Sequence, residues 1–141
     1  MRAAVFYGSG KIKVEEVDYP KCGPEDVIIK VEYCGICGSD KGPYLGHLGK
    51  PAVLGHEITG TVAEIGERVE DFRKGDEVGV YNNVYCGECY YCKRGLTNVC
   101  VGTKEFPHPI RIGLETSGGY AEYVSVPEKC TLSIPKDIPL D

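Results

Sequence analysis

The sequence predicts a mainly β fold, built as a barrel or sandwich of short strands. Apolar and polar residues alternate in several short segments, which is the period of a half-buried strand. The 141 residues include 19 glycines and 9 prolines, so turn-forming residues recur between these segments. Helical periodicity is weak throughout. Short strands at this spacing, with turns between them, are typical of all-β barrels and sandwiches.

The individual strands are predicted from this alternation and from the turns that bound them. Gly8-Ser9-Gly10 forms a hairpin-like turn after the first strand, and Gly23-Pro24 precedes the third. In that third strand every second residue from Val27 to Tyr33 is apolar, which predicts one buried face. Lys74-Gly75-Asp76 separates the fourth strand from the fifth. The predicted strands are Met1–Tyr7, Lys11–Val17, Val27–Tyr33, Gly60–Ile65, Glu77–Tyr81, Tyr120–Val126 and Thr131–Ile134.

Helix is expected only as short turns, one near Ser39–Leu45 and one near Tyr90–Gly95. No internal repeat, low-complexity tract or linker divides the sequence, so one domain is predicted. The proline-containing segment Ile134–Pro139 is expected to leave the barrel as irregular chain.

Charge and hydropathy exclude several classes of partner. The net charge is −5 and the sequence has no lysine and arginine cluster, which argues against a broad nucleic-acid-binding surface. No apolar run approaches the ~18 residues that cross a membrane. Met1–Gly10 lacks the apolar stretch of a signal peptide, so a cytoplasmic location without membrane contact is predicted. In that compartment the eight cysteines are expected to bind metal rather than to form disulfides.

Four cysteines, Cys86, Cys89, Cys92 and Cys100, form a C-x2-C-x2-C-x7-C run. Four thiolates in so short a stretch can converge on one tetrahedral ion, and Zn²⁺ suits four sulfur ligands. A bacterial-type iron–sulfur run has a shorter last gap and a proline after the last cysteine, whereas Val101 follows here. Zinc is therefore favoured over an iron–sulfur cluster and over four unliganded cysteines. Four protein ligands leave no open position, so this site is predicted to stabilise a loop and to do no chemistry.

A second group of candidate ligands lies nearer the start of the chain. Cys34 and Cys37 form a C-x2-C pair that is compatible with a redox dithiol. Such a dithiol needs a following helix to lower a thiol pKa, and Gly38 and Gly42 disfavour a strong helix there. His56 follows about twenty residues later, just before a predicted strand. A cysteine and a histidine can form a mixed zinc site with a vacant position, which is the catalytic kind.

Five motifs, in order along the chain, resemble the N-terminal catalytic domain of the zinc-dependent medium-chain alcohol dehydrogenases. The resemblance implies a GroES-like fold over residues 1–141, which is a partly open β-barrel with a zinc-bound cysteine lobe at about 84–101. The motifs cover nearly the whole chain: Gly35–Asp40, Gly55–Gly60, Phe72–Val78, the four-cysteine run and Gly118–Tyr123.

The resemblance also implies roles for individual residues. Cys37 and His56 correspond to ligands of a catalytic zinc, and Glu57 to a nearby carboxylate that some members bring onto the metal. Asp40 corresponds to the residue that fixes the imidazole of the ligand histidine. Ser39 corresponds to the hydroxyl that passes the substrate proton away. The cysteines without a family role are expected to be small buried hydrophobes: Cys22, Cys34 and Cys130.

Three expected parts of the family's machinery are not found in the sequence. It has no G-x-G-x-x-G dinucleotide motif, and we expect no cofactor-binding residue in it. Family enzymes carry a Rossmann domain after this region, so the chain is interpreted as an excised or incompletely represented N-terminal domain. The third catalytic ligand, a Cys, Asp or Glu, is likewise expected beyond Asp141. Gly42 stands where many members have the histidine of the proton relay.

The predicted function is the catalytic part of a zinc-dependent alcohol or polyol dehydrogenase. Zinc is expected to polarise the oxygen of a small alcohol or carbonyl substrate while hydride passes to or from NAD or NADP. The complete protein is expected to hold two zinc ions and to be a homodimer or homotetramer, and this segment alone is expected to be inactive. The alternative is a stand-alone zinc-binding structural or interaction module without redox activity.

Overall fold

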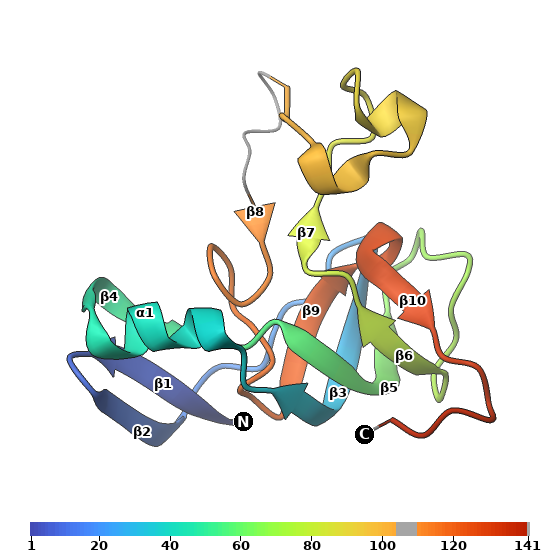
Figure 1. The fold of residues 1–141 in the computed structure, drawn as a ribbon. Helices are drawn as coiled ribbons and strands as arrows, with labels where there is room; N and C mark the ends of the chain where they lie inside the picture. Colours follow the sequence, from blue (N-terminus) through green and yellow to red (C-terminus); the bar gives the residue numbers. More distant parts are fainter. Residues whose placement is uncertain (104–109, 141) are drawn as a thin grey trace.

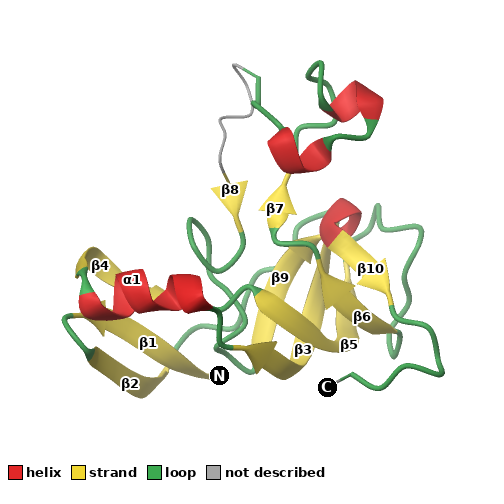
Figure 2. Ribbon diagram, in the orientation of Figure 1, coloured by secondary structure: helices red, strands yellow, loops and turns green. Residues whose placement is uncertain are grey.

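The computed structural model describes residues 1–103 and 110–140, and it is built mainly of β-strands with a few short helical turns (Figures 1 and 2). The described strands are β1 (Arg2–Gly8), β2 (Lys11–Glu16), β3 (Asp26–Gly35), β4 (His47–Val53), β5 (Glu57–Ile65), β6 (Glu77–Val80), β7 (Asn83–Val84), β8 (Ile110–Arg111), β9 (Tyr123–Pro127) and β10 (Thr131–Ser133).

The largest sheet has the strand order β10-β6-β5-β3-β9, and each neighbouring pair is antiparallel. It curls into part of a barrel (Figure 2). Within the described residues β9 and β10 form the two edges and do not pair with each other, so the barrel is open. The β3–β5 pairing is the longest, and it runs from Val27 opposite Ile65 to Gly35 opposite Glu57. The predicted mainly β, partly open barrel is confirmed.

A smaller sheet, β2-β1-β4, lies beside the barrel (Figure 1). The segment before β9 connects the two. The N–H of Ala4 in β1 donates to the carbonyl of Tyr120 at 2.7 Å, and Ala3 forms an isolated bridge with Ala121. This junction fixes the backbone of Tyr120 between the two sheets.

The core lies inside the curled sheet, where alternate residues of neighbouring strands meet. Val27 and Ile29 of β3 are fully buried there, as the alternation predicts. The prediction of one buried face fails at two positions, because Ile28 is also fully buried and Tyr33 is 53% exposed. The exposure of Tyr33 follows from the short β9, which pairs with β3 only from Asp26 to Lys30. Beyond Lys30 one backbone bond follows, from the N–H of Val31 to the carbonyl of Glu122 at 3.0 Å, and Tyr33 lies past it.

All seven predicted strands are present, with shifted ends. β5 begins at Glu57 rather than Gly60, and β9 is shorter than predicted because Tyr120–Glu122 bonds to other segments. The sequence analysis missed β4 and the two-residue strands β7 and β8. β4 contains a glycine and a proline, which weaken the strand pattern, and it pairs with β1 at only three positions.

The helical turns lie where the sequence predicts them. A 3-10 turn at Gly38–Asp40 continues into α1 (Lys41–Leu45), and a second 3-10 turn, Cys92–Arg94, ends at Gly95 with φ 77°. Two further turns, Thr97–Val99 and Glu128–Cys130, were not predicted. In the described part of the chain no helix has the length and apolarity to cross a membrane.

Replacing Ile29 by alanine tests the core. Ile29 is 0% exposed, so Ile29→Ala should lower the free energy of unfolding by about 2–5 kcal/mol, because it opens a cavity in a packed interior. The same substitution at Ile36, which is 85% exposed, should change it by less than about 0.5 kcal/mol. Urea denaturation of the zinc-loaded chain measures both. Equal effects would contradict the assigned core.

Two candidate metal centres

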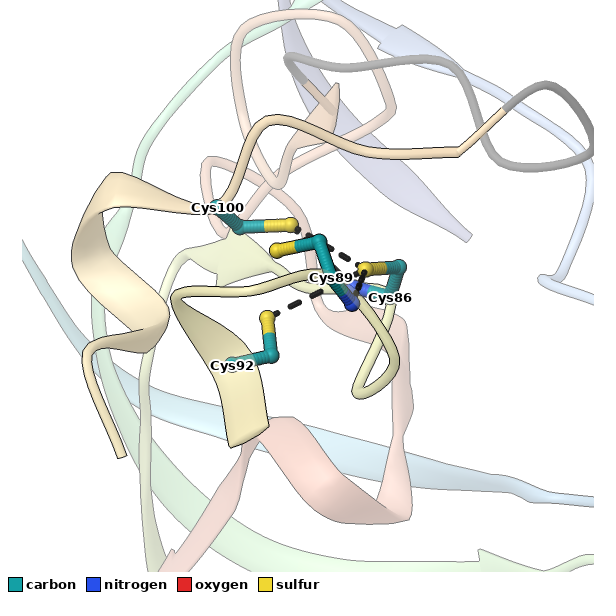
Figure 3. Close-up of side chains that lie close together, drawn as sticks. All are labelled: Cys86, Cys89, Cys92 and Cys100. Atoms are coloured by element: carbon teal, nitrogen blue, oxygen red, sulfur yellow. Dashed lines mark hydrogen bonds between the residues drawn. The ribbon is translucent and has the colours of Figure 1, made fainter. Parts of the chain in front are cut away.

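The first candidate centre is the cysteine lobe, which β7 and β8 carry above the barrel (Figure 1). Its four side chains point toward one another (Figure 3). Their sulfur atoms all lie within 4.8 Å of one another, and the Sγ atoms of Cys86 and Cys100 are 3.5 Å apart. The predicted convergence of these four residues is therefore present in the structure: Cys86, Cys89, Cys92 and Cys100.

Backbone N–H groups surround these sulfur atoms. The N–H of Cys89 donates to Sγ of Cys86 at 3.3 Å, and the N–H of Gly102 donates to Sγ of Cys100 at 3.3 Å. Backbone donors lower the pKa of Cys89 to about 6, whereas burial raises the pKa of Cys92 to about 12. The thiols of the cluster thus differ in how readily they ionise, and a bound cation would favour the thiolate form of Cys92. A tetrahedral Zn²⁺ fits this donor set.

The second candidate centre lies at one end of the β3–β5 pair. Cys37 follows the end of β3, and His56 and Glu57 lie at the start of β5. Because Gly35 pairs with Glu57, the antiparallel register brings these two chain ends together. One ligand atom from each of Cys37, His56 and Glu57 lies within 4.8 Å of the others. The structure therefore brings together all three residues predicted as catalytic-site ligands.

Asp40 and Ser39 contact the two nitrogen atoms of the His56 imidazole. Oδ1 of Asp40 lies 3.6 Å from Nδ1, and both side chains are almost completely buried. Oγ of Ser39 lies 3.3 Å from Nε2. A carboxylate beside Nδ1 favours the tautomer protonated there, which leaves the Nε2 lone pair facing Ser39 and the other candidate ligands.

Gly55 provides the backbone conformation with which the chain enters the second centre. Its φ is +96°, and a Cβ at this position would lie 2.7 Å from Sγ of Cys34 and 2.9 Å from the Tyr120 ring. Only glycine fits this backbone without strain or clash. The glycine before His56 is thus required by local packing.

The sequence analysis missed Tyr120 as part of this site. Its hydroxyl donates to Oδ2 of Asp40 at 2.7 Å and lies 3.1 Å from the carbonyl of Gly35. The motif Gly118–Tyr123 was recognised, but only as a family marker. The only signal available in the sequence was the residue type, because the hydroxyl of a buried tyrosine usually forms a hydrogen bond.

The other cysteines are outside both clusters. Cys130 is fully buried, as expected, whereas Cys22 and Cys34 are only half-buried. Burial raises the pKa of Cys34 to about 11, so Cys34 is not the activated thiol of a Cys34/Cys37 redox dithiol. All eight cysteines lie in the described part of the chain, and none forms a disulfide.

A groove of about 420 Å³ opens beside the second centre. Its walls are largely apolar, and Cys37 and Asp40 reach it from the site. Ile36, Tyr44 and Tyr120 are among the other residues that line it. The volume is in the range of small-molecule pockets.

Residues 23–136 match the alcohol dehydrogenase GroES-like domain family. The match covers most of the chain, and the chain belongs to this family. The predicted GroES-like catalytic-domain fold of the zinc-dependent medium-chain alcohol dehydrogenases is therefore confirmed.

Three relatives illustrate the family. The L-threonine 3-dehydrogenase of Pyrococcus furiosus is 39% identical over 145 residues, which cover 99% of this chain and 39% of that protein. A cobalt- and zinc-bound alcohol dehydrogenase from Pyrobaculum aerophilum is 37% identical with a TM-score of 0.86, covering 99% of this chain and 42% of that one. An alcohol dehydrogenase from Escherichia coli, complexed with NADH, is 35% identical with a TM-score of 0.87, covering 99% and 40%. The chain thus spans about 39% of the length of a curated relative.

Replacing one lobe cysteine tests the first centre. Cys100→Ser should remove about one zinc ion per chain, because a tetrahedral site loses one of its four thiolates. Cys22→Ser, at a cysteine outside both clusters, should leave the zinc content unchanged. Elemental analysis after dialysis measures both. Equal zinc content in the two variants would contradict the assignment.

Alkylation of Cys34 tests the rejected dithiol. With a pKa of about 11, Cys34 is only about 1% ionised at pH 9, where an ordinary thiol is about half ionised. Its reaction with iodoacetamide should therefore be roughly 50-fold slower than that of glutathione, and its rate should keep rising above pH 10. Peptide mass spectrometry of the metal-free chain follows the reaction. A rate that levels off below pH 8 would restore the dithiol hypothesis.

Proposed function

We propose that this chain is the catalytic domain of a zinc- and NAD(P)-dependent dehydrogenase that acts on a small alcohol or polyol, or on the corresponding carbonyl compound. The observation that carries the proposal is the convergence of Cys37, His56 and Glu57, with Asp40 beside the imidazole. Membership of the alcohol dehydrogenase GroES-like family supports the same chemistry.

Cys37 and His56 would hold the catalytic zinc, and Glu57 would be the alternative to a third ligand from outside residues 1–141. The donor set fits, since a thiolate, an imidazole and a carboxylate oxygen are all zinc ligands and leave a position open for substrate. Zinc bound there would supply a Lewis acid for an alcohol or carbonyl oxygen. The groove beside Cys37 has room for a small substrate.

Ser39 would handle the substrate proton in this proposal. Its side chain is exposed and its Oγ lies 3.3 Å from Nε2 of His56, so the hydroxyl is close to the position where a substrate oxygen would bind. Asp40 would hold the imidazole through Nδ1 and take no part in the proton transfer itself.

The cysteine lobe would hold the second zinc ion and take no part in the reaction. Its four sulfur ligands close the coordination sphere, so its contribution would be to the stability of residues 84–101. A zinc module without redox activity would need only this lobe. It would give no role to the Cys37, His56 and Glu57 cluster, and we therefore favour the dehydrogenase.

The remaining features concern the complete protein. We propose that NAD or NADP binds to a Rossmann domain outside residues 1–141 and that a third zinc ligand also comes from outside them. The relative complexed with NADH supports the choice of a nicotinamide cofactor. A homodimer or homotetramer is proposed on the family resemblance. A cytoplasmic location is proposed on the eight cysteines, none of which forms a disulfide.

Replacing Cys37 in the complete protein tests the proposed function. Cys37→Ala should lower the zinc content from about two ions per chain to about one and reduce alcohol oxidation on the order of 10³-fold, because the Lewis acid is lost. Cys22→Ser should preserve both quantities, since Cys22 lies outside the two clusters. Elemental analysis and NAD(P)H absorbance measure the outcome. One zinc per chain in the unaltered protein, with alcohol oxidation intact in Cys37→Ala, would refute the proposal.

A further inference from the structure

Tyr120 is held rigidly where two sheets and the second metal centre meet. Its N–H donates to the carbonyl of Leu54 at 2.9 Å, and its carbonyl accepts the N–H of Ala4 at 2.7 Å. Its ring stacks on Phe6 with 5.6 Å between the ring centroids. The backbone and the ring are therefore fixed independently of the hydroxyl, whose position is set by its surroundings.

The hydroxyl carries one proton, and its shorter contact is to a carboxylate. It lies 2.7 Å from Oδ2 of Asp40 and 3.1 Å from the carbonyl oxygen of Gly35. A hydrogen bond to an ionised acceptor is the stronger of the two. Burial, followed by the contact with Asp40, raises the pKa of Tyr120, so the phenol keeps this proton at neutral pH.

Asp40 contacts two of the three candidate ligands of the second centre, Cys37 and His56. Its Oδ2 accepts the N–H of Cys37 at 2.9 Å as well as the hydroxyl of Tyr120. These two bonds fix the carboxylate and leave Oδ1 directed at Nδ1 of His56, 3.6 Å away. Oδ1 and Nδ1 are both buried and have no hydrogen-bond partner. The orientation of the carboxylate therefore controls how the imidazole can be held.

We propose that Tyr120 is a positioning residue for the metal: acting through Asp40, its hydroxyl orients His56 and raises the affinity of the Cys37–His56 site for a divalent cation. The inference rests on the proposed catalytic metal site and goes beyond it by assigning a residue that would act on the metal only through Asp40. Groups that orient a metal-binding histidine commonly change metal affinity by 10–100-fold.

Tyr120→Phe tests this inference because it removes the hydroxyl and keeps the ring that stacks on Phe6. Tyr7→Phe is the matched control, since the Tyr7 hydroxyl also donates to a carboxylate at 2.7 Å, but to Glu15, away from the metal centres. The dissociation constant for Zn²⁺ is measured in the complete protein by competition with a chelator. The Cys37→Ala variant reports the binding of the four-cysteine site alone.

Tyr120→Phe should weaken zinc binding at the Cys37–His56 site about tenfold or more, whereas Tyr7→Phe should change it less than about twofold. Loaded with Co²⁺, Tyr120→Phe should also show a shifted visible spectrum for this site and an unchanged four-cysteine spectrum. Unchanged affinity in Tyr120→Phe, or an equal loss in both variants, would overturn the inference.

A double-mutant cycle with Asp40→Asn separates positioning from a general loss of structure. If Tyr120 acts through Asp40, adding Tyr120→Phe to Asp40→Asn should weaken binding less than about twofold further. Two independent structural effects would instead multiply, and that result would overturn the inference. If the unaltered chain binds no metal beyond the four-cysteine site, the proposed function itself fails, which is a different outcome from an unaltered site that ignores Tyr120.

Discussion

The antiparallel pairing of β3 with β5 is the constraint on which the rest of the structure depends. It places Val27 opposite Ile65 at one end and Gly35 opposite Glu57 at the other. The first half of this pair builds the core, and its far end positions the candidate ligands. A shift of one residue would turn the buried side chains outward and would also separate Cys37 from His56. The strand pairing that forms the barrel therefore also brings the candidate ligands of the site together.

The two metal centres depend on this pairing to different degrees. The four lobe cysteines lie within fifteen residues of one another, so they can converge with little loop-closure cost and need only a local turn. Cys37 and His56 meet only because two strands pair, and the glycine before His56 permits the close approach of Tyr120 and Cys34. A cation at the second centre would therefore stabilise the barrel itself, whereas a cation in the lobe would stabilise mainly the lobe.

The sequence predicts those features that depend on neighbours along the chain. Alternation and turn residues predict seven of the ten described strands, and cysteine spacing predicts the lobe. Features that depend on distant segments were missed or misjudged. β4 forms against an edge and contains residues that disfavour strands, and Tyr33 is exposed because β9 ends before reaching it. The Tyr120–Asp40 bond joins residues 80 positions apart, and no local pattern encodes it. The ligands of the second centre were predicted by resemblance, while their contacts required the fold.

The hydrogen-bond donors around Asp40 explain how the fold tolerates a buried carboxylate. It is 4% exposed, and a buried charge needs donors to offset its lost hydration. Cys37 and Tyr120 satisfy Oδ2, whereas Oδ1 faces an equally unpartnered Nδ1 of His56. Each unpaired buried polar atom costs about 1–3 kcal/mol, so this pair lowers the stability of the folded state. Cys37 and His56 would hold the cation, and a bound cation would make the imidazole of His56 a stronger hydrogen-bond donor to Asp40. Metal binding would then strengthen the attraction between these two facing atoms, which couples the stability of the domain to its proposed chemistry.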